Sequence, residues 1–300
     1  MLRRSILHSI VFSAMAMAMT SCGGGETGRY PNDTRLSQPT ANAPVRVGTI
    51  PRQAPPQVYG ESAIVIDAYS GRVLYAKNAD QIRPVASTQK IVTALTVISA
   101  GNVNKPVVIQ SSDTQCEPTK LYVSPGQTYT RQELMKALMV KSGNDVARAL
   151  ARDVGGSQEG FSAMMNRKAA SLGMRNSRFI NPNGLPAQGQ YSTARDIAIA
   201  SRAAYNVPLI RSWAETKAYT FRFSNGRTKL LTNTNKLLKR VPYCDGMKTG
   251  TTNAAGRCLV ATGELNGRAA IVVVLKSNST HIWNDSEKLL RWALERPEGG

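Results

Sequence analysis

The segment from Ala86 to Gly101 constrains the fold most strongly, because it has the composition of a helix that is buried on nearly all sides. Apolar residues recur through it at helical spacing, and Lys90 is its only charged residue. A helix with so little polar surface belongs in the core of a domain, and Gly101 is a suitable end. The rest of the chain must therefore supply elements that cover this segment.

Strand patterns occur at both ends of the foldable region, and helix patterns occur between them. Ser62–Asp67 and Arg72–Lys77 read as a hairpin. Three strands are predicted over residues 246–252, 257–263 and 268–276, followed by a helix over 282–294. Further helices are predicted over residues 131–140, 144–154, 158–172 and 193–205, and a second hairpin over 217–223 and 227–232. This order is typical of an α+β fold, in which an antiparallel sheet built from the first hairpin and the last three strands is flanked by helices and joined to an all-helical subregion.

Residues 1–22 have the features of an export signal. Arg3 and Arg4 precede an apolar stretch that is too short to span a bilayer comfortably. The stretch ends at Cys22, which follows small residues and precedes three glycines, a pattern that resembles a bacterial lipobox. We expect cleavage before Cys22, a lipid on its thiol, and an exported chain held at a membrane. A plain secretory signal with an incidental Cys22 is the alternative.

Residues 23–57 are rich in proline and small polar residues, which predicts a disordered tether. Its last ten residues could instead lie on the surface of the domain. The folded domain is expected over residues 58–295, with a tail over 296–300. No internal repeat is present.

The chain has 38 Lys and Arg against 19 Asp and Glu, a formal net charge of +19. Such an excess indicates anionic partners or a solvated basic surface, and it says little about the fold. Anionic lipid and an anionic cell wall both fit. Nucleic acid is not expected, because the chain lacks zinc-finger spacings, RNP-type aromatic motifs and dense basic runs.

A nucleophile and a base stand at the start of the apolar helix. Ser87 and Lys90 are three residues apart, so they share one face of a helix. A neutral lysine can take the proton of a serine and activate it, and burial would lower the pKa of Lys90 in that direction. The alternatives are helix capping by Ser87 and a surface charge at Lys90. His8 lies in the leader and His281 stands alone before the last predicted helix, so neither a serine–histidine–aspartate triad nor a histidine zinc site is available. No metal or cofactor is expected.

Two further motifs follow, Ser142-Gly143-Asn144 and Lys248-Thr249-Gly250. With Ser87–Lys90, and in this order, they form the signature of penicillin-binding proteins and serine β-lactamases. Longer segments resemble the D-alanyl-D-alanine carboxypeptidase family of low-molecular-mass penicillin-binding proteins: residues 84–95, 138–147, 172–185, 191–198 and 245–260. The resemblance covers about residues 58–294 and implies a penicillin-binding, transpeptidase-like fold. Many members have a further C-terminal β-rich domain, which this chain is expected to lack.

The resemblance implies a role for each catalytic residue. Ser87 would be the nucleophile and Lys90 its base. Ser142 would relay a proton to the leaving amine, and Asn144 would hydrogen-bond both the substrate amide and Lys90.

The third motif would bind the substrate. Lys248 would supply positive charge near Ser142, and the Thr249 hydroxyl would bind the terminal carboxylate of the substrate. Gly250 would allow a ligand backbone to come close. The backbone N–H groups of Ser87 and Thr251 would form the oxyanion hole.

The implied reaction is acyl transfer from D-Ala-D-Ala of a peptidoglycan stem peptide to Ser87, followed by hydrolysis, with β-lactams as covalent inhibitors. A DD-endopeptidase that cuts peptidoglycan crosslinks would use the same residues. A β-lactamase is disfavoured, because residues 179–190 contain no acidic residue that could activate a deacylating water. A non-catalytic wall-binding lipoprotein is the alternative from another class.

Three cysteines follow Cys22. Cys244 and Cys258 flank the third motif at a spacing that suits two antiparallel strands, so a disulfide between them is expected and Cys116 would be free. Three separate buried thiols are the alternative.

Overall fold

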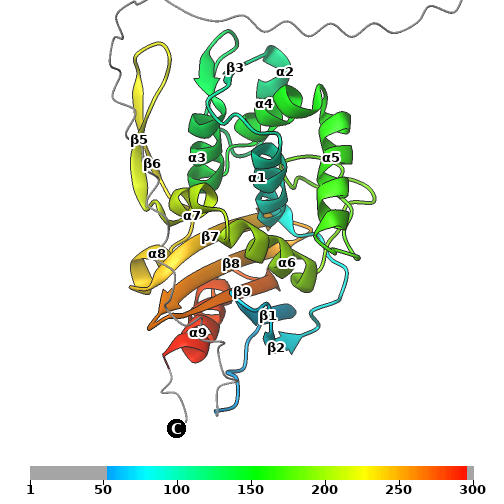
Figure 1. Ribbon diagram of the computed structural model, residues 1–300, viewed down its shortest axis with the longest axis vertical. Helices are drawn as coiled ribbons and strands as arrows, with labels where there is room; N and C mark the ends of the chain where they lie inside the picture. The colour runs from blue at the N-terminus through cyan, green and yellow to red at the C-terminus, as the bar shows by residue number, and fades with distance from the viewer. Residues whose placement is uncertain (1–52, 296–300) are drawn as a thin grey trace, which may run out of the picture. The chain divides into compact units, whose positions relative to one another are not determined.

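A computed structural model describes residues 53–295 of the 300-residue chain. It is built around a five-stranded antiparallel sheet with the strand order β2-β1-β9-β8-β7 (Figure 1). Its strands are β1 (Ser62–Asp67), β2 (Val73–Lys77), β7 (Cys244–Thr252), β8 (Gly256–Leu265) and β9 (Arg268–Ser277). The prediction that the first hairpin joins the last three strands is confirmed, because β1 pairs with β9 along its whole length.

The chain between β2 and β7 contains most of the helices (Figure 1). They are η1 (Ala86–Gln89), α1 (Lys90–Ser99), α2 (Ser111–Thr114), α3 (Arg131–Lys141), α4 (Asn144–Gly155), α5 (Gln158–Ser171), α6 (Ala194–Tyr205), α7 (Pro208–Glu215) and α8 (Leu237–Arg240), and α9 (His281–Leu294) follows β9. Two small two-stranded sheets pair β3 (Pro106–Val108) with β4 (Thr128–Thr130) and β5 (Ala218–Arg222) with β6 (Thr228–Thr232). The sequence patterns did not indicate β3, β4, α2, α7 or α8, each of which has eight residues or fewer.

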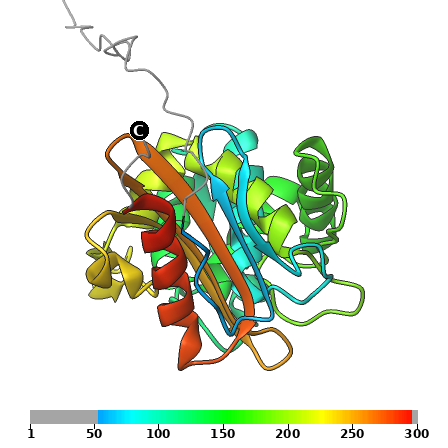
Figure 2. The same cartoon turned by 90° about the horizontal axis from the view of Figure 1, so that it is seen from below.

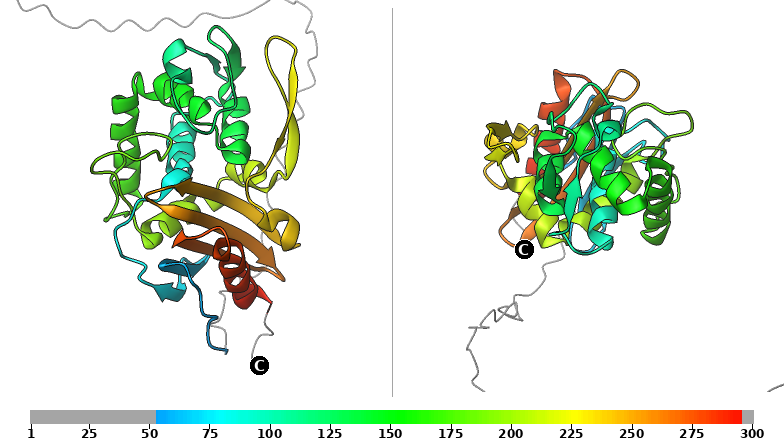
Figure 3. Two further views of the ribbon diagram at one scale, coloured as in Figure 1. Left: turned by 180° about the vertical axis from the view of Figure 1, so that it is seen from behind. Right: turned by 90° about the horizontal axis from the view of Figure 1, so that it is seen from above.

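Each face of the sheet has its own hydrophobic core. On β1, Ile64 and Ile66 belong to the core that also contains α1 and α3 to α7, whereas Ala63 and Val65 belong to the core under α9. Successive strand residues point to opposite faces, so a strand covered on both sides is apolar throughout. Figures 2 and 3 show α9 on one side of the sheet and the helical region on the other.

The apolar segment forms a buried helix, as predicted, and Lys90 to Val97 are all buried. Its first turn differs from the prediction, because η1 is a 3₁₀-helix rather than α-helix. Side chains three residues apart are nearly eclipsed in a 3₁₀-helix. The tighter turn therefore brings Ser87 directly over the start of α1.

The predicted leader and the tether as far as residue 52 lie outside the described residues. The last part of that tether lies on the domain, since Trp292 Nε1 donates a hydrogen bond of 2.9 Å to the carbonyl oxygen of Gln53. Among residues 53–295, none of the helices combines the length and the apolar character needed to cross a bilayer.

The predicted disulfide between Cys244 and Cys258 is wrong, and both thiols are free and buried, while Cys116 is free and half-buried. The register of the β7–β8 hairpin explains this result, because Cys244 lies opposite Gly263 and Cys258 lies opposite Gly250. The two cysteines are thus about six residues apart along the strands, roughly 20 Å at the strand rise per residue, which no disulfide can bridge.

Candidate active site

Ser87 and Lys90 meet at the junction of η1 and α1. Lys90 Nζ lies 2.8 Å from Ser87 Oγ, 2.8 Å from Asn144 Oδ1 and 2.7 Å from the carbonyl oxygen of Asn183. Ser87 Oγ also donates to the Asn183 carbonyl at 3.2 Å. Ser87 is not a helix N-cap, because Val85 holds that position for η1 and Gln89 holds it for α1.

The environment of Lys90 favours a neutral amine. Lys90 is 0% exposed, and its burial, reinforced by the nearby charge of Lys248, holds its pKa well below its ordinary value. An ammonium group has three donors and no acceptor. A neutral amine would donate to Asn144 and Asn183 and accept the serine proton on its lone pair once the Ser87 hydroxyl rotates away from the Asn183 carbonyl. The three neighbours therefore fit a base that is ready to take the serine proton.

A second serine–lysine pair lies next to the first. Lys248, on β7, is 1% exposed, and its Nζ donates to Ser142 Oγ at 2.8 Å and to the Thr249 carbonyl at 3.0 Å. Burial lowers the pKa of Lys248 to about 7. Ser142 ends α3 in the left-handed conformation with φ 65°, which turns the chain so that α4 starts two residues later.

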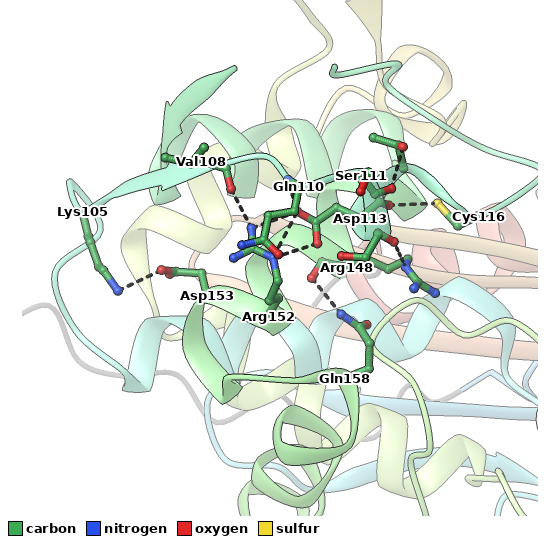
Figure 4. A network of polar contacts seen from close by, with 12 residues as sticks. Lys105, Val108, Gln110, Ser111, Asp113, Cys116, Arg148, Arg152, Asp153 and Gln158 are labelled. Carbon is green, nitrogen blue, oxygen red and sulfur yellow. Dashed lines mark hydrogen bonds and ion pairs between the residues drawn. The ribbon is translucent and has the colours of Figure 1, made fainter. Parts of the chain in front are cut away.

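Asn144 begins α4, and α4 is anchored from several sides. Its Arg152 contacts Asp113 through two guanidinium nitrogens, at 3.1 Å and 2.9 Å, and donates to the Val108 carbonyl at 2.6 Å. Asp153 pairs with Lys105 at 2.8 Å (Figure 4). These contacts hold the C-terminal end of α4 against the 105–116 segment, at the opposite end of the helix from Asn144.

The N-terminal end of α4 is bound to the loop between α2 and β4. Both carboxylate oxygens of Asp145 accept backbone N–H groups, from Leu121 at 2.9 Å and from Tyr122 at 2.8 Å. Asn144 N donates to the Thr119 carbonyl at 2.7 Å, and Asn144 Nδ2 donates to the Glu117 carbonyl at 3.3 Å. A carboxylate at the start of a helix is also stabilised by the helix dipole.

Thr249 and Thr251 face an open cleft of about 830 Å³ that Ser87 and Ser142 also line. Thr249 Oγ1 hydrogen-bonds Thr234 Oγ1 at 2.7 Å. Arg257 lies opposite Thr251 in the β7–β8 register and donates to its Oγ1 at 3.2 Å. A hydroxyl pair and a guanidinium therefore share one face of β7 beside the nucleophile.

Gly250 lines the cleft and also lies against the turn that carries the nucleophile, residues 86–88. A side chain on Gly250 would meet Ser87 N at 2.8 Å and Thr88 N at 2.9 Å. Glycine is therefore needed here for β7 to pack against this turn, and close approach of a ligand backbone to Gly250 stays a prediction. On the other side, Gly184 (φ +80°) leaves room for the Ala86 carbonyl, which a side chain there would meet at 2.1 Å.

The structure therefore brings together all the residues of the three motifs: Ser87, Lys90, Ser142, Asn144, Lys248, Thr249, Gly250 and Thr251. Cys22 lies outside the described residues. The sequence did not assign roles to Asn183, Gly184, Thr234, Asp145 or Arg257. Asn183-Gly184 stood within a segment that carried the family resemblance, which was the only signal for them. Among residues 53–295, His, Cys, Asp and Glu side chains form no group of three that could hold a metal ion.

Comparison with known proteins identifies the family. The family model described as D-alanyl-D-alanine carboxypeptidase matches residues 49–279. The chain belongs to the D-alanyl-D-alanine carboxypeptidase family. This match spans η1, the Ser142 turn and β7, so all three motifs of the site fall within the family region.

Members of the carboxypeptidase family resemble the chain at about one third identity. The D-alanyl-D-alanine carboxypeptidase DacF of Bacillus subtilis is 34% identical over 79% of this chain, which spans 63% of DacF. A D-alanyl-D-alanine endopeptidase of Pseudomonas aeruginosa is 32% identical over 84% of this chain and 82% of its own length. The crystal structure of a D-alanyl-D-alanine carboxypeptidase from Mycobacterium tuberculosis superposes with a TM-score of 0.76 at 32% identity, covering 81% of this chain and 95% of that one.

Proposed function

We propose that this chain is a serine DD-carboxypeptidase, which removes the terminal D-Ala from peptidoglycan stem peptides through an acyl-enzyme on Ser87. The observation that carries the proposal is the buried Lys90 amine 2.8 Å from Ser87 Oγ, with its pKa held low. Family membership gives the substrate class.

In the first step Ser87 Oγ attacks the carbonyl carbon between the two D-Ala residues, and its proton passes to Lys90 Nζ. The oxygen of the tetrahedral intermediate takes hydrogen bonds from the N–H groups of Ser87 and Thr251. Such donors contribute about 10²–10³ in rate each.

In the second step the C–N bond breaks and D-Ala leaves. The serine's proton reaches the leaving nitrogen through Ser142 Oγ, which Lys248 orients at 2.8 Å. Thr249 binds the carboxylate of the departing D-Ala. Water then attacks the ester, Lys90 takes a proton from that water, and the proton returns to Ser87 Oγ.

Mass spectrometry after treatment with penicillin and with a pentapeptide tests the proposal. We expect one penicillin adduct on the peptide that contains Ser87, and free D-Ala from the pentapeptide. Ser87→Ala should give neither product. An adduct elsewhere, or D-Ala released by Ser87→Ala, would refute the assignment.

The endopeptidase alternative has support in the name of the P. aeruginosa relative. Digestion of defined muropeptides separates the two activities. Free D-Ala indicates carboxypeptidase activity, and conversion of crosslinked dimers to monomers indicates endopeptidase activity.

A non-catalytic wall-binding lipoprotein would not be labelled by fluorescent penicillin, and a β-lactamase would turn over nitrocefin rapidly.

We further propose that residues 1–22 direct export, that Cys22 is lipidated, and that residues 23–57 tether a domain over 58–295 to a bacterial membrane. The lipobox-like pattern supports this proposal. Metabolic labelling with a radioactive fatty acid should mark the chain, whereas Cys22→Ala should be exported without the label.

A further inference from the structure

Two hollows lie beside the turn that carries the nucleophile, a large cleft that Ser87 itself lines and a smaller hollow against Ala86. The cleft of about 830 Å³ is lined by Ser142 and Thr249, the groups that handle the leaving amine and its carboxylate. A smaller hollow of about 310 Å³ is lined by Ala86, Gly184 and Thr252. On the mechanism proposed above, the large cleft is the leaving-group side and the small hollow is the acyl side.

The two sides differ sharply in charge. No charged residue lines the acyl side. Five cationic residues and no acidic residue line the leaving-group side: Lys217, Lys236, Lys239, Arg240 and Arg257. Four of them belong to residues 216–244, a stretch with seven Lys and Arg and no Asp or Glu. We call Lys217, Lys236 and Lys239 the lysine wall.

The segment that carries the wall is held in place. Asn235 Nδ2 donates to the Gly246 carbonyl at 2.8 Å, and Asn233 Nδ2 donates to the carbonyls of Ala214 and Thr216 at 3.0 Å each. Thr234 hydrogen-bonds Thr249, in the third motif. The wall is thus fixed to the same strand that presents Thr249 to the substrate.

The lysine wall has no counter-charge of its own within the described residues. Arg240 pairs with Glu287 at 2.6 Å, but no carboxylate of residues 53–295 forms an ion pair with Lys217, Lys236 or Lys239. Lys236 Nζ lies 5.5 Å from the centre of the Trp283 ring. Clustered charges of one sign repel each other and attract anionic ligands.

We infer that the leaving-group side is a subsite for amines that carry a second carboxylate. A single D-Ala has one carboxylate, and the Thr249 and Thr251 hydroxyls with Arg257 suffice for it. The lysine wall lines the same cleft and matches a further anionic group on a larger leaving amine. The inference rests on the proposed function, since it extends the leaving group of that reaction.

Three peptides that are identical up to the penultimate D-Ala test this inference. They end in D-Glu, in the isosteric neutral D-Gln, and in D-Ala. We expect kcat/KM for the D-Glu peptide to exceed that for the D-Gln peptide by about fivefold or more at low ionic strength, and added NaCl to reduce the ratio because it screens exposed charges. The salt series uses the unaltered chain and so does not depend on any variant folding.

Matched triple variants locate the effect. Lys217→Gln/Lys236→Gln/Lys239→Gln should bring the D-Glu to D-Gln ratio close to one. Arg222→Gln/Arg227→Gln/Lys229→Gln removes as many charges from the same stretch, but from residues that do not line the cleft, and should keep the ratio.

Each other outcome overturns the inference. A ratio near one in the unaltered chain, or the same ratio in both triple variants, refutes the subsite while D-Ala release leaves the proposed function standing. Failure to hydrolyse any of the peptides, together with absence of a penicillin adduct, refutes the proposed function and the subsite with it.

Discussion

Lys90 and Lys248 are 0% and 1% exposed, so the protein buries two amines in one site. Burial disfavours the charged form of each amine, and neither has a carboxylate among its hydrogen-bond partners. Burial therefore favours a neutral Lys90, which acts as a base without a neighbouring histidine. Lys248 carries its positive charge in the free enzyme only near and below neutral pH.

The pKa of Lys248 predicts how stability changes with pH. The pKa is about 7 in the folded chain against an ordinary value of 10.5, so between these values the unfolded chain binds the extra proton. The free energy of unfolding should therefore rise from pH 7 toward pH 10.5, by at most roughly 1.4 kcal/mol per pH unit from this group. Below pH 7 both states are protonated and the contribution is flat.

Lys248→Met removes this titration while keeping most of the length of the side chain. The difference in free energy of unfolding between the unaltered chain and Lys248→Met, measured by urea denaturation across this range, reports the titration of Lys248 together with its effect on Lys90. A difference that is independent of pH would show that Lys248 titrates normally in the folded chain.

At the scale of elements, the turn that carries the nucleophile, residues 86–88, packs between the loop that contains Gly184 and strand β7. Gly184 approaches the Ala86 carbonyl from one side, and Gly250 approaches Ser87 N from the other. Only a residue without a side chain fits at either position. Placement of Ser87 thus depends on backbone contacts with two segments that are distant in sequence.

Gly184→Ala should displace this turn. The new Cβ would lie 2.1 Å from the Ala86 carbonyl oxygen, and φ at Gly184 is +80°. We expect a loss of about 2–4 kcal/mol in stability and a much slower acylation by penicillin. Gly156→Ala is the matched control, because φ there is +73° but nothing lies within 4 Å. It should lose only about 1 kcal/mol and acylate normally; equal effects of the two variants would refute this packing.

Asp145 joins α4 to the loop between α2 and β4 through the N–H groups of Leu121 and Tyr122. Asp145→Asn replaces one acceptor oxygen by a donor, so one of these N–H groups loses its partner. We expect a loss of about 1–3 kcal/mol and faster hydrogen exchange at residues 121 and 122. Asp80→Asn removes the exposed ion pair with Arg195 and should cost less than about 1 kcal/mol. Unchanged exchange at residues 121 and 122 would contradict the proposed link.

Sequence reasoning succeeded where a signal is local. The three-residue spacing of Ser87 and Lys90, and the cap of α6 by Thr193, whose hydroxyl accepts from Asp196 N, both depend on neighbouring residues. It failed for contacts between segments that are far apart in the sequence. The Asn183 carbonyl accepts a hydrogen bond from Lys90, which is 93 positions away. Every residue has a backbone carbonyl, so no residue type indicates this contact. The disulfide failed because spacing alone does not reveal the register of a hairpin.

At the scale of the whole molecule, the sheet separates catalysis from the attachment of the N-terminal segment. Ser87, Lys90 and Asn144 lie on the helical side, whereas the segment before β1 joins α9 on the other side. There the N–H groups of Tyr59 and Gly60 both donate to Asp285 Oδ2 at 2.9 Å, and Asp285 is 1% exposed. The segment therefore supplies donors to a buried carboxylate that needs them.

A chain that begins at Glu61 should be folded but less stable than one that begins at Gln53. Asp285 would lose two hydrogen bonds to its charged carboxylate, and we expect a loss of about 1.5–3 kcal/mol for each of them. The rate of acylation by penicillin well below the melting temperature should change by less than about threefold, because distant sites act nearly independently. Thermal unfolding and stopped-flow acylation measure the two quantities. Equal melting temperatures would show that the segment contributes nothing to the domain, whereas a large fall in acylation rate with unchanged stability would place it in the catalytic half.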